Sequence, residues 1–488
     1  MEDYYDNTYD ENEDLYDFSY DDNVRVVADG DSIDWRDGYD SCVSSSLVQV
    51  PTFIAPFIVA NIVLCMISKV QVRFLPSFMF HLSNISCGLY LLYNSIDRGR
   101  WYLFQLLAPA YLLLKLSTKN SQRIRLDLVL CVFCIAYLII CEIYEQNAEV
   151  WHHIRGVLMI VVMKIISLAL DSKSDGLVKS QINTLAFLGY ICCPANCIFG
   201  PWTSFRDYME SQPKKNARLL SLTPTAKYIY QIAFNLTFAI LCLLFSNCAQ
   251  VFLISDYTWK WLAAYVVALS FRTSHYFVSF LSQATMVSAG YSTENRHGSK
   301  STVSKHSRVF GYTVVLPWNI ELPYSLIHVV VAWNVPMHNF LKQYVFRVLK
   351  PYGTFTAVFL TYVTSSLLHG LNFQLWATLL TLGIWSYVEY NIRKKLAHIF
   401  SACVAVGKCN GICAKHKLGR TAALSIVINF TFCCLSFIHL IYLGTIFDAS
   451  SELQTEGFSF WHAVQKWQEL HYLSHWILVL GLIFNWLI

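Results

Sequence analysis

Long apolar runs separated by short polar connections occupy the chain from about residue 47 to its C-terminus. A membrane-spanning helix needs about 20 consecutive, mainly apolar residues. Runs of this kind occur at Leu47–Ile67, Phe74–Tyr93, Trp101–Leu116, Leu126–Tyr144, Val157–Leu170, Thr184–Pro201, Ile229–Leu253, Trp259–Leu281, Leu322–Trp333, Phe355–Leu368, Leu371–Tyr390, Ala422–Phe447 and Tyr472–Ile488. Several are too short or too polar to span alone, so we predict about eleven transmembrane helices with a few partial ones. The runs are continuous and do not alternate, which favours an all-α polytopic membrane protein over a β-barrel.

Composition agrees with a chain that faces lipid. Its 488 residues are 55% hydrophobic and 14% charged, whereas soluble domains have about 25% charged residues. The first forty residues differ, because they hold 15 acidic residues and only two basic ones. We therefore predict an acidic, disordered tail over 1–45 and one multispanning domain over 46–488. The basic residues are spread between apolar runs, which excludes a folded nucleic-acid-binding face.

Basic residues in the short connections predict the orientation. Lys69 and Arg73 directly follow the first apolar run, and short loops rich in Lys and Arg face the cytosol. The acidic N-terminus is then expected in the lumen. An odd number of spans would leave the C-terminus in the cytosol.

Two polar residues near the C-terminal third of the chain are candidates for chemistry. Asn334 precedes Pro336, and His369 ends the apolar run Phe355–Leu368. Polar residues at membrane depth are costly and are functional candidates by default, although a core histidine with satisfied ring nitrogens is the plain alternative. A neutral imidazole is a good general base, and an Asn amide can donate to an oxygen that gains negative charge. The pair suits acyl transfer from a thioester to a hydroxyl.

Two further motifs have competing interpretations. In Arg155–Asp171, Lys164 and Asp171 lie on one helical face. They form either a polar seam inside the bundle or an end-of-helix pair with a Lys that extends to the interface. In Phe199–Phe205, a Gly-Pro break stands beside Trp202, which is typical of an interfacial turn with an aromatic anchor.

Most of the sixteen cysteines lie inside apolar runs, where we interpret them as packing residues and not as a disulfide framework. Cys409, Cys413 and His416 loosely fit a metal-site spacing without an obvious fourth ligand. S-acylation beside the basic segment is a competing hypothesis, and a plain loop is the default.

An ordered set of segments carries a resemblance to a known family. They are Arg155–Asp171, Phe199–Phe205, Asn319–Ser325, Ala332–Phe346, Thr361–Phe373 and Tyr387–Val404, with the specific pair WN and LLHG at Trp333-Asn334 and Leu367–Gly370. Together they resemble the membrane-bound O-acyltransferase superfamily, and within it most closely the branch that lipidates Wnt proteins. The tail 1–40 and the 291–309 loop lie outside this pattern.

The resemblance implies an endoplasmic-reticulum enzyme with a central acyl-CoA tunnel. Its donor would be palmitoleoyl-CoA and its acceptor a serine hydroxyl of a Wnt protein, with no metal or organic cofactor. His369 would be the catalytic histidine and Asn334 its partner, while Trp333 and Tyr344 would line the acyl or acceptor site. We further expect Arg393–Lys395 to meet the CoA head from the cytosol. Two alternatives remain: an acyltransferase of the same superfamily with a lipid or sterol acceptor, and a non-enzymatic membrane transporter or chaperone.

Overall fold

The computed structural model describes residues 43–96, 98–119, 125–145, 147–213, 222–254, 258–291, 311–407, 416–447 and 460–488. Within these ranges the regular structure is helical, and pairing of extended backbone is limited to an isolated bridge between Ala402 and Leu418. The predicted all-α class is confirmed. Most of the predicted tail (residues 1–42) and of the 291–309 loop lies outside the described ranges, as do Cys409 and Cys413.

The helices of the N-terminal half vary widely in length. They are α2 (Ser45–Phe74), α3 (Phe78–Ser95), α4 (Trp101–Lys119), α5 (Leu126–Tyr144), α6 (Ala148–Ser174), α7 (Gly176–Gln181), α8 (Thr184–Ile191), α9 (Phe205–Glu210), α10 (Leu222–Leu253) and α11 (Lys260–Ser288). Short helices then lead to four longer ones near the C-terminus. They are α13 (Pro317–Glu321), α14 (Leu326–Trp333), α15 (Val335–Leu341), a π-helix (Lys342–Phe346), α16 (Arg347–Leu349), a 3₁₀ turn (Lys350–Tyr352), α17 (Thr354–Leu368), α18 (Phe373–Ile399), α19 (Ala423–Gly444), α21 (Phe460–Glu469) and α22 (Leu473–Leu487).

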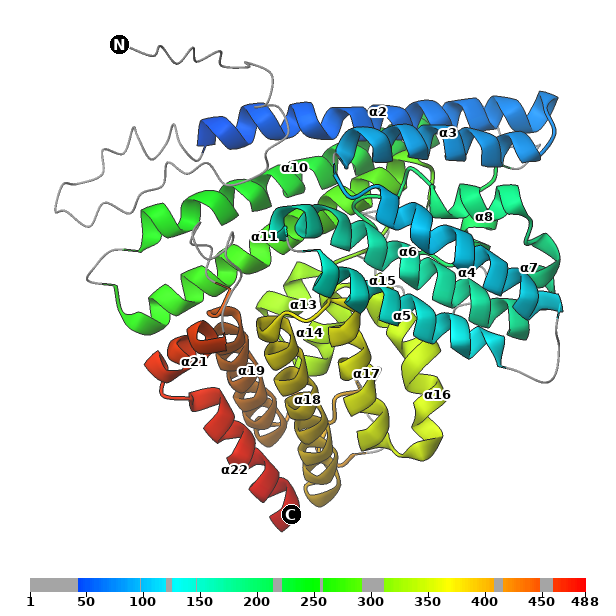
Figure 1. Ribbon diagram of the computed structural model, residues 1–488. Coiled ribbons are helices and arrows are strands. Elements are labelled where there is room, and N and C mark those ends of the chain that lie inside the picture. The colour runs from blue at the N-terminus through cyan, green and yellow to red at the C-terminus, as the bar shows by residue number, and fades with distance from the viewer. Residues whose placement is uncertain are drawn as a thin grey trace, which may run out of the picture.

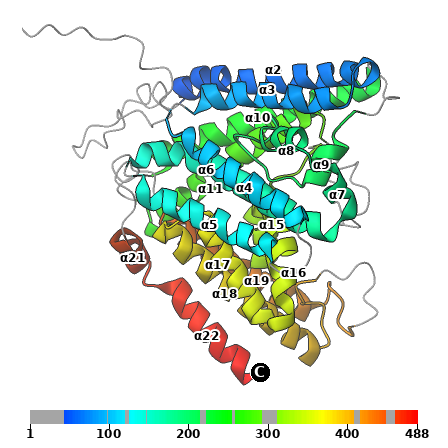
Figure 2. The same cartoon turned by 45° about the vertical axis from the view of Figure 1, so that its right-hand side comes forward.

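The helices form two groups that run in different directions. Figures 1 and 2 show α2–α6, α10 and α11 crossing the view, whereas α17, α18, α19 and α22 descend beneath them. Helices α10 and α11 pack side by side, as do α5 with α6 and α17 with α18. The groups meet where α11 packs against α19 and where α5 packs against α17.

Helix α5 matches the predicted run Leu126–Tyr144, but the run Thr184–Pro201 is not a span. Helix α8 ends at Ile191, and irregular backbone follows. The Nζ of Lys164 donates to the carbonyl oxygens of Tyr190 and Ile191 at 2.9 and 3.1 Å, and to Asn196 Oδ1 at 2.7 Å. These bonds satisfy carbonyls that the end of a helix leaves unpaired.

The Lys164 side chain is fully buried, so its interpretation as an end-of-helix residue that reaches the interface is wrong. Lys164 pairs with Tyr190, Ile191 and Asn196 and not with Asp171, so a polar seam formed by both residues stays a prediction. The interpretation of Trp202 as the anchor of an interfacial turn is also wrong. Its side chain is 7% exposed, and its indole N–H donates to Ser167 Oγ at 3.1 Å. It belongs to the protein interior and is not an interfacial anchor.

Five described helical segments are long and apolar enough to cross a membrane: Ser46–Gln71, Leu126–Tyr144, Val150–Ser174, Thr225–Ala249 and Ala423–Gly444. The bent pair α21 and α22 would make a sixth. Helix length and hydropathy thus identify fewer spans among the described residues than the predicted total of about eleven transmembrane helices. That total stays a prediction. Long helices such as α11 and α18 carry buried polar side chains, among them Arg272 and Arg393, which lower their hydropathy although those side chains face protein.

Candidate active site

The turn that carries His369 is fixed by a carboxylate from the other helix group. His369 is the C-cap of α17, and its N–H donates to the carbonyls of Ser365 and Ser366. Gly370 follows with φ +87°, a conformation that favours glycine. Glu142 Oε2, from the end of α5, accepts the N–H of Leu371 at 2.8 Å. A Cβ on Gly370 would overlap the Glu142 carboxylate, so the glycine after His369 is required by this approach.

The His369 ring is left available by the protein. It is partly exposed, and neither ring nitrogen forms a hydrogen bond with the residues that the structure describes. Arg155 on α6 and His275 on α11 are close enough to interact with it electrostatically. Glu142 acts in turn on Arg155, which offsets the positive charge near the imidazole. The ring can therefore exchange a proton with a substrate without first breaking a protein contact.

Asn334 connects two short helices and keeps one half of its amide free. It ends α14 and caps α15, where its Oδ1 accepts the N–H of Met337 at 3.1 Å. This is the usual role of an N-cap side chain. The Nδ2 group makes no hydrogen bond with described residues, so two N–H donors remain for a ligand.

His275 on α11, which the sequence pattern did not indicate, lies against Trp333, the residue before Asn334. Its ring stacks on the Trp333 indole with centroids 4.5 Å apart and planes 13° apart, while it also interacts with His369. Ring stacking thus joins α11 to Trp333 at the end of α14, while the convergence of Asn334 with His369 stays a prediction. The available signal was a histidine inside the predicted span Trp259–Leu281, which is a functional candidate for the same reason as His369.

Tyr344 lies in a different cluster. It occupies the π-helix, its hydroxyl donates to Asp171 Oδ2 at 2.8 Å, and its ring packs against Trp202 and Phe340. Its described contacts do not include His369 or Asn334. Its assignment to a substrate-lining role stays a prediction.

The expectation that Arg393 meets the CoA head is wrong. Its side chain is fully buried, donates to Asn429 Oδ1 at 2.8 Å and to the Tyr324 carbonyl at 3.2 Å, and lies 3.5 Å from the Glu389 carboxylate. A guanidinium held in this way has no free face for a phosphate. Lys394, the next residue, is exposed.

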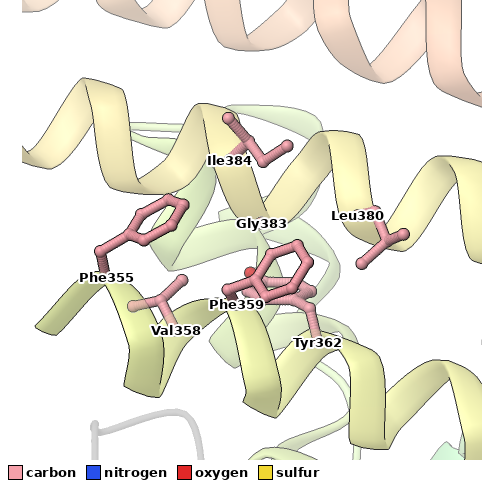
Figure 3. Close-up of a pocket in the computed structure, with 7 residues that line it drawn as sticks. All are labelled: Phe355, Val358, Phe359, Tyr362, Leu380, Gly383 and Ile384. Carbon is pink, nitrogen blue, oxygen red and sulfur yellow. The ribbon is translucent and has the colours of Figure 1, made fainter. Parts of the chain in front are cut away.

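The side chains of α17 and α18 leave between them an apolar gap that has no room for a water molecule (Figure 3). It is lined by Phe355, Val358, Phe359, Tyr362, Leu380, Gly383 and Ile384. Tyr362 precedes His369 by about two helical turns, or roughly 10 Å along the axis. Thr364, Ser365 and Ser366 lie between this gap and His369, so the path along α17 to the histidine is not wholly apolar. A tunnel that joins the two membrane faces stays a prediction.

The possible metal ligands are only partly described. His416 Nδ1 lies 3.5 Å from Cys403 Sγ, but Cys409 and Cys413 lie outside the described ranges. Among the residues that the structure describes, no group of three or more His, Cys, Asp or Glu side chains could hold a metal ion.

Comparisons with known proteins identify the family of the chain. The membrane-bound O-acyltransferase family matches residues 97–397, which include Asn334 and His369. The protein-serine O-palmitoleoyltransferase porcupine of Anopheles gambiae is 38% identical over 467 residues, covering 92% of this chain and 93% of that protein. The human porcupine is 35% identical over 429 residues, covering 83% and 87%. Lysophospholipid acyltransferase 2 of Arabidopsis thaliana is 22% identical over 350 residues, covering 64% and 74%. The chain is a multi-pass membrane acyltransferase that belongs to the membrane-bound O-acyltransferase family.

Proposed function

We propose that this acyltransferase moves a palmitoleoyl group from palmitoleoyl-CoA to a serine hydroxyl of Wnt proteins in the membrane of the endoplasmic reticulum. The names of the relatives that share more than 30% identity over most of the chain support a protein-serine acceptor and a palmitoleoyl donor. The resemblance of the WN and LLHG segments to the Wnt-lipidating branch supports Wnt as that acceptor.

The proposed reaction gives one role to the His369 ring and one to the Nδ2 group of Asn334. The serine oxygen attacks the thioester carbonyl carbon, and its proton passes to the His369 ring. Asn334 Nδ2 donates to the carbonyl oxygen as negative charge develops there. The C–S bond then breaks, and the CoA sulfur leaves with the proton that His369 returns. General-base catalysis contributes about 10²–10⁴-fold and one oxyanion donor about 10²–10³-fold.

One observation carries this proposal. The ring of His369 and the Nδ2 group of Asn334 both lack hydrogen-bond partners among the described residues, which leaves a proton acceptor and an N–H donor available to a ligand. The proposed reaction uses no organic cofactor or metal.

The acceptor class is the point that needs a direct test, because a weaker relative acts on lysophospholipids by its name. The purified protein is given palmitoleoyl-CoA with a Wnt hairpin peptide, with the same peptide carrying Ala for Ser, or with a lysophospholipid. We expect acylation of the serine peptide alone. Acylation of the lysophospholipid without the peptide would overturn the Wnt assignment. Fractionation of cells tests the endoplasmic-reticulum location.

The role of His369 is tested in the same assay. His369→Ala should lower turnover by about 10²–10⁴-fold, whereas His398→Ala, at an exposed position near the end of α18, should retain it. Full peptide acylation by His369→Ala would exclude it as the base.

A further inference from the structure

A groove in the C-terminal helix group lies away from the chemistry above. Helix α22 packs against both α18 and α19 (Figure 1), and the three helices leave about 350 Å³ of space between them. An enclosed apolar cavity of about 150 Å³ holds benzene, so this groove has room for a longer stretch of carbon chain. Its lining on α18 begins at Trp385, about 18 Å along the axis from Phe373, where that helix starts after His369.

The lining of the groove offers nothing to a polar ligand. Its residues are apolar apart from Thr431, whose hydroxyl donates to the Val427 carbonyl at 3.0 Å within α19. Leu480 and Phe484, which line it from α22, are 63% and 43% exposed. Helix α19 is long and apolar enough to cross a membrane, so the surroundings that fill the groove are hydrocarbon. The lining therefore fits an acyl chain.

One end of the groove is marked by a lysine that joins two of its helices. Leu396 lines the groove near the end of α18, and Phe484 lines it near the end of α22. Beside them, Lys395 Nζ donates to the carbonyl of Asn485. This end therefore has an ammonium group at the border of the apolar lining.

The segment that leads into α19 brings further cations to the same end. Leu418 belongs to a small apolar cluster with Leu396 and Ile428, which both line the groove. Lys417 and Arg420, on either side of Leu418, are exposed. From residue 393 to residue 447 the chain has seven basic residues and no Asp or Glu. The end of the groove therefore has a strong positive charge.

An apolar groove with a basic end matches the two parts of an anionic phospholipid. Basic segments of this kind face the cytosol, and the cytosolic leaflet contains anionic lipids that bind to basic pockets between transmembrane helices. We propose that the groove binds one acyl chain of an anionic phospholipid, with the lipid phosphate beside Lys395. This inference does not rest on the proposed function, because the groove is separate from His369.

The charge of the lipid is tested first. Native mass spectrometry of the delipidated full-length protein in detergent gives the Kd of phosphatidylserine and of phosphatidylcholine with the same acyl chains. Phosphatidylserine should bind more tightly. Lys395→Met should raise its Kd about fivefold, the effect of one basic residue near an anionic lipid. The control is Lys394→Met, because Lys394 is exposed and lies on the face of α18 opposite Ile392 and the groove. It should leave the Kd unchanged.

The position of the acyl chain is tested by filling the groove. Leu480→Trp should raise the Kd of both lipids about tenfold, because the loss of contact with about two methylene groups has this effect. Leu482→Trp is the control, since Leu482 is exposed but does not line the groove. It should retain the Kd of the wild type.

Three results would overturn the proposal. Equal Kd values for the two lipids would exclude an anionic ligand, and unchanged values in both Lys395→Met and Leu480→Trp would exclude the groove. Displacement of bound phosphatidylserine by equimolar palmitoleoyl-CoA would assign the groove to the acyl donor. If Lys395→Met does not fold, the double variant Lys417→Gln with Arg420→Gln replaces it, and the Kd of phosphatidylserine should then rise about 25-fold.

Discussion

At the scale of single residues, Asn334 combines a structural and a chemical role in one amide. Its Oδ1 caps α15 through the N–H of Met337, and its Nδ2 is free among the described residues. The two roles use different atoms and can therefore be separated by substitution. An aspartate keeps an oxygen at the capping position and removes the N–H donors.

We predict that Asn334→Asp retains the thermal stability of the wild type but lowers kcat by about 10²–10³-fold, the effect of a lost oxyanion donor. Asn334→Ala should lose both activity and about 0.5–2 kcal/mol of stability, because the cap is removed as well. Thermal melting in detergent and the peptide acylation assay measure the two effects.

Asn183 provides the matched control. Its side chain caps α8 by accepting the N–H of Ala186 at 2.8 Å, so it has the same local role away from the junction. Asn183→Asp should keep both stability and turnover. Wild-type turnover in Asn334→Asp would show that Asn334 acts only as a helix cap.

At the scale of elements, Lys164 determines where α8 ends. Its Nζ bonds to two carbonyls at the end of α8 and to Asn196 of the following segment. Asn196 Nδ2 in turn donates to Thr203 Oγ1 at 2.9 Å. One buried ammonium group therefore organises the irregular segment that leads to Trp202.

We predict that Lys164→Met destabilises the protein by about 1–3 kcal/mol for each buried acceptor that loses its donor. The methionine fills a similar volume, so the loss reports on hydrogen bonding and not on a cavity. The measurement is thermal melting in detergent with size-exclusion chromatography.

Lys173→Met, on the same helix, is the comparison. Lys173 pairs with the buried Asp127 carboxylate at 3.2 Å, but its own side chain is half exposed, and Arg125 also pairs with that carboxylate at 3.2 Å. Lys173→Met therefore leaves Asp127 a charged partner and should cost less than Lys164→Met. Equal melting temperatures for the two variants would contradict the role assigned to Lys164.

At the scale of the whole molecule, the basic residues near the C-terminal end of α2 predict how the chain is oriented in the membrane. We predict that a glycosylation site added before residue 1 is modified, because Lys69 and Arg73 hold the far end of α2 in the cytosol. A site added after the C-terminus should stay unmodified. Sensitivity to an endoglycosidase measures the modification at each site. Modification of the C-terminal site alone would show that the chain has the opposite orientation. Replacing Lys69 and Arg73 together by Glu should reduce modification of the N-terminal site.

The sequence predicted those parts of the fold that depend on local patterns. Helix α5 has the predicted bounds because polar residues flank a continuous apolar run. The end of α8 could not be predicted, because it depends on Lys164, which is distant in the chain. Asn334 and His369 were recognisable as polar residues in apolar surroundings. The convergence of His275 on Trp333 was not, because it arises only when α11 packs beside α14. The burial of Arg393 was missed because its partner Asn429 belongs to another helix.

The bond between Glu142 and Leu371 has a mechanical consequence. Glu142 belongs to the helix group that crosses the view in Figure 1, whereas Leu371 links α17 to α18 in the group beneath it. This hydrogen bond connects the two helix groups two residues after His369. The end of α17, which carries His369, is thereby coupled to α5. A shift of the two helix groups relative to one another at this point would therefore move the turn that holds the histidine.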